Sequence, residues 1–209
     1  LQDTLTFVLS HLTSSDPEEV SVALDVLERV ALKIPLKLDQ YYVVLNGVFD
    51  HLEKMSFTQV FRIYSVFAAL SFIDRTGSGQ LEVNDHVYSE VRMMVSKQLG
   101  NGELRYKRMG IAGALALIYR AGSAGSHLVI EAIHILGHVK DIYKSNPWAL
   151  ALFYDELAAG IAKLSEEMVG HLMKTVTQEF SDTCLLQSVP DGIDPMYSLQ
   201  GNDDGGSTT

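Results

Sequence analysis

The sequence is poor in the residue types that many functional classes need. Its 209 residues include a single cysteine, Cys184. A lone thiol cannot form an intramolecular disulfide, which fits a reducing compartment such as the cytosol or the nucleus. Cys184 lies in an apolar run with no histidine close to it in sequence. We therefore interpret it as a small buried hydrophobic residue and not as a nucleophile.

Basic charge and long apolar runs are also scarce. The net charge is −10, whereas an isolated nucleic-acid-binding domain is usually basic. The charge leaves open a role in a larger DNA-binding assembly whose basic surface lies elsewhere. No apolar run reaches the roughly 18 to 20 residues that span a bilayer, so we expect no membrane role. The sequence has no start methionine and no signal peptide, and we interpret it as a piece of a longer protein.

Catalytic motifs are missing as well. We find no glycine-rich phosphate loop, no zinc-protease spacing, and no carboxylate pair that stands out from the solvated helix faces. Glu131, His134 and His138 share one helical face, but a di-iron site would need a matching second motif and further glutamates. These side chains are more typical of surface or loosely packed histidines. The sequence therefore predicts no enzymatic activity and no cofactor.

Apolar residues at helical spacing run through most of the chain. Asp16 before Pro17 is typical of a helix start, and Ser56 with Gln59 predicts a capping box. No alternating strand pattern of any length precedes Cys184. Amphipathic helices are expected at about 17–34, 38–54, 57–71, 87–99, 104–119, 128–143, 147–161 and 165–180.

Helices of this length, joined by short loops, indicate antiparallel neighbours. The sequence has no crisp internal repeat. It therefore predicts an all-α fold, a degenerate α-solenoid of antiparallel helix pairs of the armadillo or HEAT type, with a globular helical bundle as the alternative. We expect the solenoid segment to span residues 1–183, and an irregular, acidic, flexible stretch to span 184–209.

One loop resembles an EF-hand calcium loop. Gly79 occupies the sharp-turn position, and amphipathic helices flank the loop. The twelfth position is an aspartate where glutamate is usual, there are few negative ligands, and no second loop follows. A glycine- and serine-rich helix connector is the competing interpretation. The candidate ligands are Asp74, Thr76, Ser78, Gln80 and Asp85.

One basic cluster interleaves an aromatic residue at an expected helix start. Arg105, Lys107 and Arg108 flank Tyr106. Such a run can contact DNA phosphates, and it is also what an ordinary solvated helix face looks like. These three residues are the candidate DNA contacts.

Several stretches together resemble the central part of the Fanconi anaemia group D-two family, in the family's order and at about its spacing. No single stretch is diagnostic, and the resemblance covers about residues 5–199. The stretches are 23–27, 45–52, 97–99, 106–114, 151–158 and 178–182.

The resemblance implies a nuclear, non-enzymatic scaffold built as a long α-solenoid. The family pairs with the related group I protein and closes around double-stranded DNA during interstrand crosslink repair. A dedicated ligase complex attaches one ubiquitin to a single lysine of the family protein, which locks the clamp. The family has a variable connector in place of 74–85, which argues against the calcium loop.

The sequence departs from the family at the ubiquitin acceptor. By resemblance, the acceptor lysine directly precedes the glycine matched by Gly47, and here that position is Asn46. Asparagine has no amine and cannot form an isopeptide bond. Either the acceptor has moved, with Lys54 or Lys37 as substitutes, or this chain is not modified here, or the alignment is out of register.

Two other functions remain as alternatives to the repair scaffold. A generic helical-repeat adaptor without a DNA role would present a peptide-binding concave face. A calcium-binding module would use the loop 74–85.

Overall fold

The computed structural model describes residues 2–12, 14–123 and 126–181. The chain divides into two compact units, Leu1–Val169 and Gly170–Thr209. Cys184 and the predicted flexible stretch 184–209 lie outside the described residues, so the interpretation of that cysteine and the boundary after residue 183 stay predictions. Of the second unit, the structure describes the C-terminal part of one helix.

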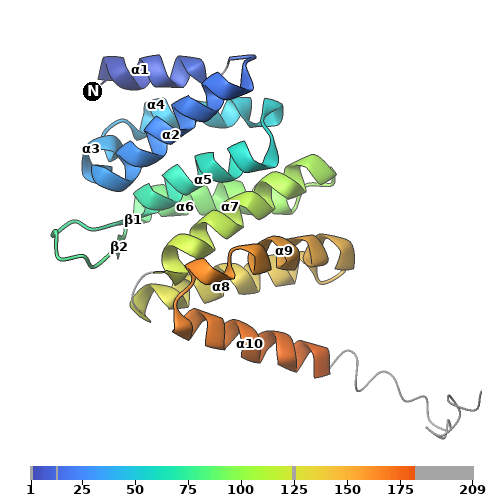
Figure 1. The fold of residues 1–209 in the computed structure, drawn as a ribbon. Helices are drawn as coiled ribbons and strands as arrows, with labels where there is room; N and C mark the ends of the chain where they lie inside the picture. Colours follow the sequence, from blue (N-terminus) through green and yellow to red (C-terminus); the bar gives the residue numbers. More distant parts are fainter. Residues whose placement is uncertain (1, 13, 124–125, 182–209) are drawn as a thin grey trace, which may run out of the picture. The chain divides into compact units, whose positions relative to one another are not determined.

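The predicted fold class is confirmed, because the described residues are almost entirely helical (Figure 1). None of the described helices is long and apolar enough to cross a membrane. In chain order, the elements are α1 Gln2–His11, α2 Pro17–Lys33, α3 Pro35–Asp39, α4 Tyr42–Asn46, the 3₁₀ helix η1 Gly47–Lys54, α5 Phe57–Ser71, strands β1 Phe72–Ile73 and β2 Glu82–Val83, α6 Asp85–Leu99, α7 Leu104–Gly122, α8 Ser126–Tyr143, α9 Pro147–Ala159, η2 Ile161–Lys163 and α10 Glu166–Phe180.

Local capping signals begin the helices where the sequence places them. The Asp16 carboxylate accepts a hydrogen bond from the Glu18 backbone N–H at 2.9 Å, ahead of Pro17 in the first turn of α2. Ser56 and Gln59 form the reciprocal capping box of α5. Both motifs satisfy backbone donors that a helix start leaves without an intrahelical partner.

The segment 38–54 is not the single helix that its periodicity predicts. It consists of α3, α4 and the 3₁₀ helix η1, with a break at Tyr41. Val43, Val44 and Gly47 are poor helix formers. They lower the tendency of this segment to form one continuous α-helix. Phe49 from η1 still packs on Phe67 of α5, with ring centroids 4.4 Å apart.

Helix α7 lies at the centre of the first unit. It packs against α5, α6, α8 and α9, and every residue from 109 to 119 is buried. The sequence predicts this, because 104–119 is apolar on almost all sides. Gly110 permits close packing of α7 on the end of α6, since a Cβ there would lie 2.6 Å from the Leu99 backbone nitrogen.

The other principal contacts join helices that are near one another in sequence. Helix α1 packs on α2, α2 on α5, α5 on α6, and α8 on α9. Packing between adjacent helices is confirmed and is what stacked helix pairs require. The choice of a solenoid over a globular bundle stays a prediction.

The structure adds one feature that the sequence analysis does not predict, a minimal antiparallel strand pair. Phe72 pairs with Val83 and Ile73 with Glu82. The strands are two residues long, too short to show an alternating pattern. They close the base of the loop 74–81 ahead of α6.

Candidate functional site

The start of α7 places the basic cluster at the protein surface. In the loop before α7, the Asn101 side chain accepts a hydrogen bond from the Glu103 backbone N–H at 2.9 Å. The helix then begins at Leu104. Arg105 and Arg108 are exposed and lie three residues apart, on one side of the helix. Lys107 is half-buried and does not join them. The structure thus brings together two of the three candidate DNA contacts.

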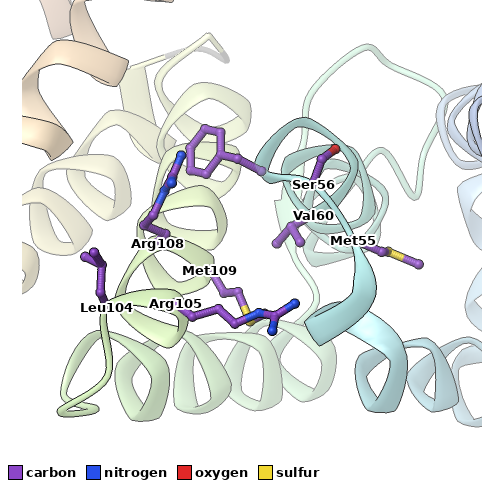
Figure 2. A pocket seen from close by; sticks show the side chains of 8 residues that line it. Met55, Ser56, Val60, Leu104, Arg105, Arg108 and Met109 are labelled. Atoms are coloured by element: carbon purple, nitrogen blue, oxygen red, sulfur yellow. The ribbon is translucent and has the colours of Figure 1, made fainter. Parts of the chain in front are cut away.

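A pocket of about 460 Å³ lies between the start of α7 and the start of α5, and both arginines line it (Figure 2). Both arginine side chains reach along it from α7. Its walls are otherwise mainly apolar. The lining residues are Met55, Ser56, Phe57, Val60, Leu104, Arg105, Arg108 and Met109.

The electrostatics of this pocket favour an anion. The Arg108 guanidinium lies over the Phe57 ring at 5.7 Å from the centroid, and this cation–π contact favours its position beside the pocket. Within the part of the chain that the structure describes, no carboxylate forms an ion pair with Arg105 or Arg108. The first turn of α7 has no acidic residue and no side-chain cap. Two cations therefore lie at the positive end of the helix dipole, where an anion would be stabilised.

Tyr106 connects this helix start to η1 instead of facing the pocket. Its hydroxyl donates a hydrogen bond to the Glu53 carboxylate. The same contact raises the pKa of Tyr106. The contact ties the start of α7 to the Glu53 carboxylate of η1.

The loop 74–81 satisfies its own polar groups. The Asp74 carboxylate accepts hydrogen bonds from the backbone N–H groups of Gly77 and Gly79, both at 2.7 Å, and these amides, with Gly79 foremost, lower the pKa of Asp74. The hydroxyls of Thr76 and Ser78 bond to each other at 2.8 Å. Gly77 and Gly79 have φ of 72° and 82°, which favours glycine.

The other candidate calcium ligands add no cluster around Asp74. Gln80 is exposed and Asp85 begins α6. Among the described residues, no group of three or more histidine, cysteine, aspartate or glutamate side chains converges to hold a metal ion. The helix-connector interpretation explains the same residue types without a metal.

The histidine face of α8 contacts α6. The His138 Nε2 lies 2.8 Å from the Ser96 hydroxyl, and the Tyr88 hydroxyl donates to the Glu131 carboxylate at 2.9 Å. His134 lies 4.0 Å from Glu131 at the exposed edge. These contacts are typical of packed or surface side chains at the interface of two neighbouring helices.

The candidate ubiquitin acceptors lie on two of the short helical elements between α2 and α5. Lys37 is exposed in α3, and Lys54 is exposed at the end of η1. Asn46, at the position that the resemblance assigns to the acceptor, is half-buried at the end of α4. Lys54 directly precedes Met55, a lining residue of the pocket.

A family model described as "Fanconi anaemia protein FancD2 nuclease" matches residues 1–199. The chain belongs to the FancD2 family. Similar proteins include the Fanconi anemia group D2 protein homologs of Rattus norvegicus and Mus musculus, each 26% identical over 95% of this chain. The Fanconi anemia group D2 protein of Gallus gallus is 24% identical over 97% of it. The chain spans about 15% of the length of these relatives.

Membership of the FancD2 family confirms the resemblance and bears on the prediction that the chain is not an enzyme. The family's description names a nuclease. Metal-dependent phosphodiester hydrolysis uses carboxylates to position metal ions, and among the described residues no three or more histidine, cysteine, aspartate or glutamate side chains gather to hold one. The absence of catalysis in this chain stays a prediction.

The pocket itself is the feature of this candidate site that sequence reasoning missed. Met55 and Val60 come from one helix start, and Leu104 and Met109 from another some fifty positions later. Each residue fits an ordinary apolar pattern within its own segment. Among the lining residues, only the arginines carry a local signal for binding, and the signal at Ser56 is that of a helix cap.

Proposed function

We propose that this chain is a non-catalytic helical segment of a FancD2-type scaffold for DNA repair in the nucleus. In the full-length protein, the scaffold pairs with the group I protein and closes around duplex DNA, and ubiquitination regulates it. Family membership over residues 1–199 and the stacked helices support this proposal. The helical-repeat adaptor and the calcium module remain the alternatives.

The single observation that carries a DNA role for this segment is the pair of exposed guanidinium groups at the start of α7. Arg105 and Arg108 lie on one side of the helix, without an ion pair to another described residue. Arginines placed this way bind phosphate oxygens independently of the base sequence. Lys107 lies on the same helix and adds to the local positive charge. The proposal therefore concerns backbone contacts and not base recognition.

The test is duplex DNA binding by this chain over a series of salt concentrations, measured by fluorescence anisotropy. Replacing Arg105, Lys107 and Arg108 by alanine should weaken binding uniformly across DNA sequences. The slope of log K against log salt should decrease in magnitude by about 2 to 3, roughly 0.9 for each phosphate that the protein no longer neutralises.

A variant that removes cations elsewhere on the surface serves as the control. Arg29→Ala with Arg75→Ala removes two exposed cations outside the pocket. It should leave the slope close to that of the unsubstituted chain. Equal binding and equal slopes for all three proteins would show that the basic cluster is an ordinary solvated face.

A further inference from the structure

We propose that the pocket between α5 and α7 binds a short acidic peptide from a partner protein. One apolar side chain of the peptide enters the pocket, and carboxylates on either side of it bind Arg105 and Arg108. This inference does not rest on the proposed DNA contact, because it depends on the pocket walls as well as on the charges.

The walls provide a site for an apolar side chain. Val60 and Met109 form a buried floor, with 2% and 4% of their surface exposed. Met55 is half-buried, and Leu104, 48% exposed, stands at the rim. The volume of about 460 Å³ lies within the range of about 300 to 1,000 Å³ found for ligand pockets. Methionine walls adapt to anchors of different shape.

The rim provides the complementary charge. Arg105 and Arg108 both line the pocket and are exposed, so a carboxylate can reach them without displacing a described partner. A guanidinium binds a carboxylate through two parallel hydrogen bonds. The uncapped start of α7 adds backbone N–H groups and the positive end of its dipole. The apolar walls are complementary to an apolar side chain of the peptide, and the two arginines are complementary to aspartate or glutamate residues on either side of it.

The same walls are poorly suited to a nucleotide base. Single-stranded nucleic acid binds by stacking its bases on open aromatic rings. Among the lining residues the only ring is that of Phe57, and the Arg108 guanidinium covers it at 5.7 Å. The remaining apolar walls are aliphatic or thioether side chains. These observations favour a peptide over a base as the occupant.

Acidic peptide and DNA would compete for the same guanidinium groups. A phosphate needs Arg105 and Arg108, whereas the peptide also needs Met55 and Leu104. Substitutions in the two apolar rim residues therefore separate the two kinds of binding.

The experiment measures fluorescence anisotropy of labelled synthetic peptides with the full 209-residue chain. The probes have phenylalanine, leucine or methionine flanked on both sides by glutamates. Matched probes replace the anchor by serine or the glutamates by glutamines. At least one anchored acidic probe should bind about tenfold more tightly than both of its matched probes.

Variants then assign the binding to the pocket. Met55→Ala with Leu104→Ala should weaken the anchored probe about tenfold and leave duplex DNA binding unchanged. Arg105→Ala with Arg108→Ala should weaken peptide binding by at least as much. The control pair Arg29→Ala and Arg75→Ala should not affect the peptide. Circular dichroism of each variant checks that the helices remain folded, and Leu104→Ser alone replaces the Met55 and Leu104 variant if that variant unfolds.

Three results would overturn the proposal. Equal binding of the anchored and the serine-containing probes would show that the peptide binds by charge attraction alone, without an apolar side chain in the pocket. Unchanged peptide binding by the Met55 and Leu104 variant would place the peptide elsewhere. Tighter binding of a single-stranded oligonucleotide that is lost in that same variant would make the pocket a nucleic-acid site.

Discussion

Single glycine residues set how closely α7 approaches its neighbours. A Cβ at Gly110 would lie 2.6 Å from the backbone nitrogen of Leu99 and 2.9 Å from its Cγ. The first of these atoms belongs to the main chain and cannot move aside by a rotamer change. The close approach of α6 and α7 therefore depends on the absence of a side chain at this position.

Gly110→Ala should destabilise the protein by about 1 to 3 kcal/mol, because the added methyl group forces the two helices apart. The measurement is the free energy of unfolding in urea. Gly137→Ala in α8 is the matched control, since nothing lies within 4 Å of its added Cβ. That change should stabilise the helix by about 0.5 to 1 kcal/mol, since alanine loses less backbone freedom than glycine on folding. The same sign for both variants would contradict the packing argument.

At the scale of the element, the loop 74–81 is organised by one carboxylate. The amides of Gly79 and Gly77 hold the pKa of Asp74 below its usual value. Because the pKa of Asp74 is lower in the folded than in the unfolded protein, its carboxylate stabilises the fold at pH values above the ordinary aspartate pKa, about 3.9. This contribution to stability is lost as the pH falls through the lowered pKa. An NMR titration of the Asp74 carboxyl should show the low midpoint, and Asp74→Asn should remove that part of the acid sensitivity.

Calcium binding would distinguish the two interpretations of the loop 74–81, a helix connector and a calcium loop. Both Asp74 oxygens already accept backbone hydrogen bonds, and Thr76 and Ser78 bond to each other. We therefore expect no heat in a calorimetric titration at about millimolar calcium, the weak end of EF-hand affinities. A saturable heat that Asp74→Asn abolishes would instead establish the calcium module.

Sequence reasoning succeeds for elements whose signals are local. The caps at Asp16 and Ser56 and the apolar stripe of 104–119 each lie within one segment, and each matches the structure. It fails at 38–54, where the hydrophobic period persists although Val43, Val44 and Gly47 weaken the helix. It also misses the pocket, because its walls come from α5 and α7 and only tertiary packing brings them together.

At the scale of the whole molecule, the main departure from what the family resemblance implies is Asn46, which stands where a ubiquitin-accepting lysine is expected. Isopeptide formation needs an accessible amine, and Lys37 and Lys54 are both exposed. With the reconstituted ligase complex acting on the full-length protein, we expect modification at Lys54 or Lys37, located by mass spectrometry. Replacing both by arginine should abolish it, whereas Lys33→Arg should not. A modified lysine far outside 37–54 would rule out Lys37 and Lys54 as substitute acceptors.

The burial of α7 has a consequence for how its basic end meets a ligand. A helix packed against α5, α6, α8 and α9 opens only when much of the first unit opens. Its central amides should therefore be among the slowest to exchange with deuterium. Because Arg105 and Arg108 lie directly before the buried stretch of α7, we expect their backbone to be ordered before a ligand binds, so that association loses entropy mainly in ordering the side chains.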